Sequence, residues 1–179
     1  REGGGITGLF PYYNQLLVFR ERAIEIVRGD PISGFSTVPF IQGIGTRSPN
    51  TITAVPNVGL MFLSNDGVYR VHGGMDGGSK IEIEKMTSPL VKTVKRITPA
   101  TMSRASAVFS TKWREWHCYV PVDGGDIPSM GLVYHLDKNA WSTRVSFPVS
   151  AVSVDQRGEI IFGHSVGNNG TPQYESGLF

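Results

Sequence analysis

A β-hairpin pattern that occurs twice at a fixed interval constrains the fold of this chain more than any other feature. Leu60–Gly74 reads as two apolar strands joined by a turn at Ser64–Gly67, where Gly67 supplies the positive φ that tight hairpin loops need. Leu16–Asp30, which begins 44 residues upstream, has the same length and much the same plan. A hairpin that recurs at such an interval is typical of a β-propeller.

The other strand-like segments extend these hairpins into four-stranded meanders, the unit of a propeller blade. Thr51–Val55 and Lys80–Glu84 alternate in the manner of strands and complete one meander at 51–84. A second meander, at 105–145, is predicted from Ala105–Ser110, Glu115–Pro121, Gly131–Leu136 and Ala140–Arg144. Partial units at about 16–48 and 149–179 bring the total to three or four, whereas closed propellers need four to eight blades.

Three segments depart from this pattern. Residues 1–15 look irregular, and residues 29–50 look like a long connection with short strands at most around Phe35–Val38 and Phe40–Ile41. Ser88–Ile97 is expected to be a short helix, with Ser88 as its cap. The predicted fold class is therefore all-β, a β-propeller-like array of four-stranded antiparallel meanders with one short helix near 88–97. Residues 1–179 are expected to form a single propeller-type domain or a fragment of one.

Composition excludes several classes of protein. The net charge of +2 gives no overall polyanion-binding character, and a single cysteine, Cys118, excludes an intrachain disulfide framework and a Cys-based zinc finger. No run of 18 apolar residues is present, so no membrane insertion is expected from this segment. The chain begins at Arg1 without a Met and ends without a terminating pattern, so we expect a fragment of a longer polypeptide.

The histidines and the cysteine are the first candidates for chemistry. If Pro121 faces Gly131 across a hairpin, His117 faces His135, and the two imidazoles could begin a metal site; the alternative is a pair of half-exposed strand histidines. Cys118 is adjacent to His117, but neighbours on a strand point to opposite faces, so the thiol is expected in the core. No catalytic, metal-binding or cofactor-binding residue is predicted, and no cofactor.

The carboxylates and glycines are also explained by loop chemistry. The aspartates all lie in turns or loops beside Gly, Asn, Lys or Gln, although a glycosidase pair of acids distant in sequence remains open. Gly3–Gly5 and Gly73–Gly78 lack the residues that follow a phosphate loop and are expected to be flexible connections.

A local excess of positive charge lies between residues 80 and 114. Eight Lys or Arg residues stand there against Glu82 and Glu84, a balance of +6 in a chain of net +2. These cations could face DNA phosphates or an acidic partner, or they could form a solvated face around the short helix. They are Lys80, Lys85, Lys92, Lys95, Arg96, Arg104, Lys112 and Arg114.

Aromatic residues concentrate in the 105–145 meander. Cross-strand aromatic pairs stabilise sheets, and a row of exposed rings could instead stack on sugars. The residues concerned are Trp113, Trp116, Tyr119, Tyr134 and Trp141.

Four segments, in this order and spacing, resemble the propeller domain of short-tailed bacteriophage tail nozzle proteins, the tail tubular protein B family. Leu16–Asp30 matches a hairpin with the pattern L-[VI]-V-F that ends near Gly-Asp. Ser48–Val55 matches a segment that begins with Ser-Pro and leads into a strand. Phe62–Arg70 matches an F-L-S-x-D-G-[VI]-Y-R turn, and Tyr134–Ser142 matches a Y-x-[LV]-x-x-x-x-W-S strand pair. The resemblance covers nearly all of 16–165, whereas members of that family are several times longer.

The resemblance implies a non-enzymatic structural protein of the virion tail, made in the bacterial host cytoplasm. It implies a homo-oligomer, a six-fold ring whose lumen conducts DNA during ejection. Its partners would be other tail proteins (the adaptor on the portal side, and fibres), with transient non-specific contact between the lumen and DNA. Alternative functions are a carbohydrate-binding or glycan-hydrolysing β-propeller, a phage tail hub or head-stabilisation protein, and an isolated interaction module.

Overall fold

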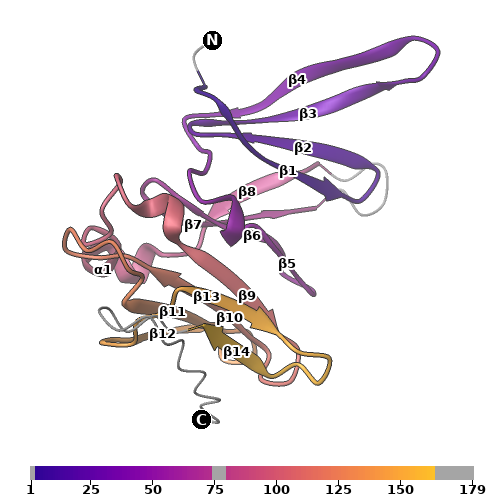
Figure 1. Ribbon diagram of the computed structural model, residues 1–179. Helices are drawn as coiled ribbons and strands as arrows, with labels where there is room; N and C mark the ends of the chain where they lie inside the picture. Colours follow the sequence, from indigo (N-terminus) through magenta and orange to yellow (C-terminus); the bar gives the residue numbers. More distant parts are fainter. Residues whose placement is uncertain (1–2, 74–79, 164–179) are drawn as a thin grey trace. The chain divides into compact units, whose positions relative to one another are not determined.

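The computed structural model describes residues 3–73 and 80–163, and its chain divides between Thr87 and Ser88 into two compact units. The described residues form an all-β fold of four antiparallel sheets with short helical segments (Figure 1). Three sheets have four strands, each hydrogen-bonded to its neighbours in chain order, which confirms the predicted meanders. Among the described residues no closed barrel or closed propeller is present.

The first sheet contains more strand than the sequence predicts. Its strands are β1 (Ile6–Tyr12), β2 (Gln15–Arg20), β3 (Ala23–Asp30) and β4 (Gly34–Gln42). The irregular structure expected for 1–15 is therefore wrong for Ile6–Tyr12, and the short strands expected around Phe35–Val38 and Phe40–Ile41 are parts of one longer strand, β4. Both strands lie at edges of the sheet and contain a proline, which an edge strand tolerates because one of its sides has no ladder partner.

The second sheet confirms the predicted meander at 51–84. It consists of β5 (Thr53–Val55), β6 (Gly59–Ser64), β7 (Gly67–His72) and β8 (Glu82–Lys85). Gly67 has a φ of 151°, as the hairpin pattern requires, and a methyl group there would overlap Thr87 Oγ1. The connection predicted at Gly73–Gly78 lies, except for Gly73, outside the described residues.

The two hairpins repeat residue by residue. Leu16 pairs with Val27 at the open end of β2–β3, and 44 residues later Leu60 pairs with Val71 at the open end of β6–β7. The closed ends, Phe19 with Ile24 and Leu63 with Val68, follow the same shift. The interval seen in the sequence is thus a repeat of strand register.

The core of the first unit is built from the inward residues of both hairpins. Leu17, Phe19, Ile24, Leu60 and Phe62 are fully buried in one apolar cluster, together with Tyr12, Ile26, Tyr69 and Val71. The rings of Phe19 and Phe62 pack edge to face at 5.1 Å between centroids.

The second unit begins with short helical turns. Where the sequence predicts one helix over Ser88–Ile97, the structure has a 3₁₀ turn at Ser88–Leu90 followed by α1 (Val91–Val94). Further 3₁₀ turns lie at Pro49–Thr51 in the first unit and at Met102–Arg104. The helix ends early because Ile97 forms a β-bridge with Val122. In the described part of the chain, no helix has the length and apolar character needed to cross a membrane.

The remaining strands confirm the second predicted meander and the beginning of another. The third sheet consists of β9 (Ser106–Ser110), β10 (Glu115–Val120), β11 (Met130–His135) and β12 (Ala140–Arg144). A two-stranded hairpin, β13 (Ala151–Val154) with β14 (Ile160–Gly163), follows it. The later strands expected at 171–179 lie outside the described residues.

Candidate functional site

The two histidines of the third sheet lie on one face, but not opposite each other. Glu115 faces His135 and His117 faces Val133, so the predicted pairing of His117 with His135 is wrong by two residues. A shift of two residues preserves the face of every side chain, and the histidines are therefore diagonal neighbours. A third residue, Glu115, lies between the two histidines and contacts both. The sequence interpretation did not single it out.

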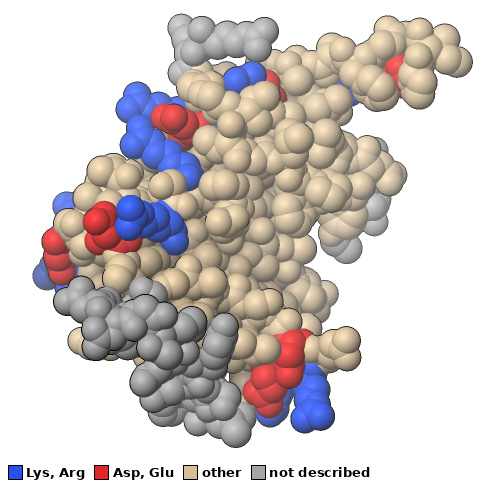
Figure 2. Space-filling view, viewed as in Figure 1, with Lys and Arg blue, Asp and Glu red and all other residues tan. Residues whose placement is uncertain are grey.

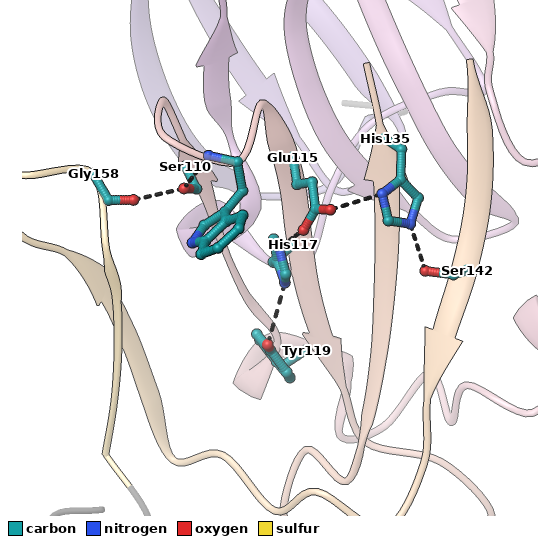
Figure 3. A network of polar contacts seen from close by, with 8 residues as sticks. Ser110, Glu115, His117, Tyr119, His135, Ser142 and Gly158 are labelled. Atoms are coloured by element: carbon teal, nitrogen blue, oxygen red, sulfur yellow. Dashed lines mark hydrogen bonds and ion pairs between the residues drawn. The ribbon is translucent and has the colours of Figure 1, made fainter. Parts of the chain in front are cut away.

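Glu115 holds both imidazoles through its two carboxylate oxygens (Figure 3). Its Oε2 is 2.9 Å from Nε2 of His117, and its Oε1 is 2.7 Å from Nδ1 of His135. Beyond these, His135 Nε2 lies 2.7 Å from Ser142 Oγ, and His117 Nδ1 lies 3.4 Å from the hydroxyl of Tyr119. Because an ionised carboxylate only accepts hydrogen bonds, each nitrogen facing Glu115 carries a proton.

Burial keeps His117 neutral. The residue is 1% exposed, and loss of hydration lowers the pKa of its imidazole to about 4, with Arg144 and His135 acting in the same direction and Glu115 opposing. Burial likewise raises the pKa of the Tyr119 hydroxyl. His117 and Tyr119, the buried members of the network, are therefore neutral, hydrogen-bonded groups.

The network lies next to a second buried contact that joins the sheet to the β13–β14 hairpin (Figure 3). Ser110 faces Glu115 across the ladder, and its hydroxyl donates to the carbonyl of Gly158 at 2.6 Å while accepting from the backbone N–H of Trp113 at 3.2 Å. Tyr119 packs edge to face on Phe162 of β14 at 5.3 Å. Polar and aromatic contacts thus hold the last hairpin against this face.

The order Ser142, His135, Glu115 is that of a serine–histidine–carboxylate triad, in which the imidazole takes the hydroxyl proton. Such a triad works only with donors aimed at the oxyanion that forms on the substrate. Ser142 lies on the exposed edge strand β12, and its Glu115 carboxylate is shared with the buried His117. The geometry favours a network that satisfies buried polar groups and can pass protons among them.

A signal for this network was present in the sequence. Glu115, His117 and Tyr119 occupy every second position of one strand, so three side chains that end in polar groups share one face of the sheet. Cys118 points to the other face, as predicted: it is fully buried, and burial raises the pKa of its thiol. Within 3–73 and 80–163, no group of three or more His, Cys, Asp or Glu residues is arranged to hold a metal ion.

Most of the predicted basic stretch is paired with acids distant in sequence. Lys85 lies 2.6 Å from Asp66, Arg96 lies 2.6 Å from Asp123, and Arg114 lies 2.6 Å from Asp137. Arg104 pairs with Asp126 at 3.6 Å, and Lys112 pairs with Glu159. Figure 2 shows cationic side chains beside anionic ones on the visible face. The eight cations are divided between the two units, Lys80 and Lys85 in the first and the others in the second.

Within the basic stretch, Lys92 and Lys95 are the two cations of the second unit for which the described residues provide no ion-pair partner. Both are exposed on and just after α1, in a segment whose first turn holds no acid. These two side chains are therefore the strongest remaining candidates for contact with an anionic partner.

The predicted aromatic cluster is largely internal. Trp116, Tyr119 and Tyr134 are 0%, 0% and 5% exposed, so these three serve the sheet and not an exposed sugar platform. Trp141 packs against Tyr134 at 5.0 Å and edge to face against Trp116 at 6.2 Å. Trp113 is 45% exposed, and Lys112 Nζ lies 4.9 Å from its ring centre.

The stability of the chain is expected to fall as the pH falls through the range set by His117. Its pKa is about 4 in the folded chain and 6.5 when unperturbed, so the unfolded chain binds more protons between these values. The contribution of His117 to the free energy of unfolding is complete above pH 6.5. It falls by roughly 2–3 kcal/mol as the pH approaches 4. Urea unfolding of the full chain between pH 7 and pH 4 measures this slope.

Two variants isolate the contribution of His117. His117→Gln should reduce the change in the free energy of unfolding between pH 7 and pH 4. His72→Gln, which removes an imidazole from the first unit, should leave that change as it is in the unmodified chain. An unchanged slope in His117→Gln would show that the pH dependence arises elsewhere.

No family model and no curated protein matches this sequence.

Proposed function

We propose that this chain is a structural subunit of a short-tailed phage tail, a β-propeller-type component of the nozzle ring that conducts DNA during ejection. The repeated strand register of β2–β3 and β6–β7 carries this proposal. It shows that the hairpin motifs that resemble the nozzle family are equivalent parts of successive four-stranded sheets, which is the organisation of propeller blades.

The positions of the motifs give further support. Leu16–Asp30 spans β2–β3, Phe62–Arg70 lies within β6–β7, and Tyr134–Ser142 covers the turn between β11 and β12 with the adjoining strand ends. In this function the protein works mechanically: stiff antiparallel meanders form a wall, loops make the contacts between subunits, and charges on the inner surface set how DNA slides. No catalytic step is assigned to any residue.

Electron microscopy of the purified chain, alone and with its neighbouring tail proteins, tests the proposal. We expect a homo-oligomeric ring with six-fold symmetry, and a mass that corresponds to it in native mass spectrometry. A protein that stays monomeric at high concentration and in the presence of tail assemblies contradicts the proposal.

The DNA-conducting role predicts weak, salt-dependent binding through Lys92 and Lys95. Each phosphate contact contributes about 0.9 to the slope of log affinity against log salt for duplex DNA, so Lys92→Ala/Lys95→Ala should reduce the slope by about 2. Fluorescence anisotropy with a labelled random-sequence duplex at several salt concentrations measures this value.

The exposed Lys138, in the β11–β12 turn outside the basic stretch, provides the matched control. Lys138→Ala should leave the slope unchanged. A slope near zero in the unmodified chain excludes DNA contact by this surface.

A further inference from the structure

Strands β3 and β4 continue past the rest of their sheet as a projecting hairpin, residues 28–39, which we call the arm (Figure 1). Every residue of the arm is exposed. Among them are three large apolar side chains: Ile32 is 98% exposed, Phe35 is 66% exposed and Val38 is 38% exposed. The arm therefore adds no buried side chain to the core of its own unit.

The arm is held in one conformation by its own turn. Asp30 Oδ1 accepts hydrogen bonds from the backbone N–H groups of Ile32 at 2.8 Å and Ser33 at 2.9 Å. Gly29 has a φ of 124°, and a side chain there would overlap the carbonyl oxygen of Gly34. A preorganised hairpin loses little conformational entropy when it binds, which favours a role in recognition.

The β4 edge of the arm has Pro39 and a bulge at its base, but it has no charged side chain to protect it. β4 is an edge strand of nine residues, and no charged residue occurs between Asp30 and Arg47. Natural proteins guard exposed edges with charged side chains, because an unguarded, apolar edge pairs with other chains. In Figure 2 the projecting part is almost entirely uncharged.

A groove of matching character lies in the same unit. It has a volume of about 580 Å³ and is lined by residues in and next to the β1–β2 and β5–β6 turns and by Gly73, none of them charged. Phe10, Tyr13, Val55 and Pro56 give it an apolar and aromatic surface, and Tyr13 is 54% exposed. A site of this size and composition is suited to large apolar side chains.

We infer that the arm of one copy of this chain binds in the groove of a second copy, with Ile32 and Phe35 as the inserted side chains. The same unit carries both surfaces, and the exposure of the whole arm shows that it does not occupy its own groove. A contact between two different patches of identical chains is head-to-tail, and such contacts generate rings when the rotation closes. The inference rests on the proposed ring assembly and names the surfaces that would form it.

Cysteine cross-linking between two variants tests the contact directly. A mixture of Phe35→Cys and Ala54→Cys chains under mild oxidation should give a disulfide-linked dimer containing one chain of each kind. The native Cys118 is fully buried and does not compete. Absence of the mixed dimer overturns the inference, as does a disulfide within a single chain that carries both substitutions.

Charge placed on the arm tests its energetic role. Ile32→Asp/Phe35→Asp should raise the dissociation constant for self-association at least tenfold in analytical ultracentrifugation, since buried apolar anchors carry most of the binding energy. Ser36→Asp puts the charge on the opposite face of β4 from Phe35 and should change the constant less than threefold. Folding is not at risk, because the arm contributes nothing to the core. Equal dissociation constants for the unmodified chain, the Ile32→Asp/Phe35→Asp chain and the Ser36→Asp chain overturn the inference.

These results separate the inference from the proposed function. A six-fold ring that still forms from Ile32→Asp/Phe35→Asp chains contradicts the arm contact and leaves the nozzle function standing. Chains that cross-link from arm to groove but never form a closed ring contradict the nozzle function and support the arm contact.

Discussion

Replacing Glu25 with alanine is expected to lower the free energy of unfolding by about 3–5 kcal/mol, because it leaves the guanidinium of Arg20 buried without its counter-charge. The two side chains are 8% and 17% exposed. They meet in a two-pronged contact, Nε to Oε1 at 2.9 Å and Nη2 to Oε2 at 3.2 Å, while Nη1 donates to the carbonyl of Gly4 at 3.1 Å. Chemical denaturation of the full chain measures the loss.

Two comparisons show whether burial is the cause. Arg20→Met/Glu25→Leu removes both charges and should cost less than Glu25→Ala alone, since no uncompensated charge remains. Glu21→Ala breaks the exposed pair with Arg47, where the side chains are 42% and 32% exposed, and should cost less than about 1 kcal/mol. A loss in Glu25→Ala no larger than that of Glu21→Ala would contradict the argument.

Truncating Phe62 to alanine is expected to cost about 3–5 kcal/mol, the range for a buried aromatic side chain. Phe62 is fully buried at the centre of the first unit, where its ring packs edge to face on Phe19 at 5.1 Å and stacks with Tyr69 at 6.1 Å. Its removal leaves a cavity between two hairpins, and thermal or urea unfolding of the full chain measures the effect.

The size of the cavity sets the cost of this change. Phe62→Leu, which keeps most of the volume, should cost roughly 1–2 kcal/mol, and Val91→Ala, on a side chain 47% exposed, should fall within about 0.5 kcal/mol. Equal losses in Phe62→Ala and Val91→Ala would show that the ring contacts carry no stability.

Strands marked by alternation or by an apolar run beside a turn signal could be predicted from the sequence, whereas the full extent of the two proline-containing edge strands of the first sheet could not. The β6–β7 hairpin has an apolar run, a turn signal and a second apolar run, all visible in order. β1 and β4 contain Pro11 and Pro39, which count against a strand unless its position at an edge is known. That position depends on pairings across the sheet, which local sequence does not contain.

Long-range partners explain the other differences. Charged residues are ordinarily exposed, but the mutual contact of Arg20 and Glu25 allows Arg20 to be buried. The acids that pair with Arg96 and Arg114 lie 27 and 23 residues further along the chain. A charge count over neighbouring residues therefore overstates the free positive charge of the basic stretch.

The sequence interpretation placed His117 and His135 on the correct face of the sheet, and its position for the candidate site was therefore close to the observed one. The pairing of β10 with β11 begins at Val120 and Met130, one residue earlier on each strand than the predicted pair of Pro121 and Gly131, which shifts the register by two residues. The reason lies outside the hairpin: Val122 is bridged to Ile97, and Asp123 donates its N–H to the carbonyl of Arg96 at 3.0 Å. Because of these contacts, Val122 and Asp123 do not continue the β10–β11 ladder.

The repeated register has a consequence for recognising related chains. The turns of the two equivalent hairpins touch, since the side-chain amide of Asn65 donates to the carbonyl of Glu21, the residue 44 positions earlier, at 3.0 Å. The packed parts of the repeat are thus fixed against each other, while the arm lies between them in sequence and outside the core. The period of 44 residues depends on the length of that arm, so a relative with a shorter arm would keep both hairpins and their contact while showing a different period.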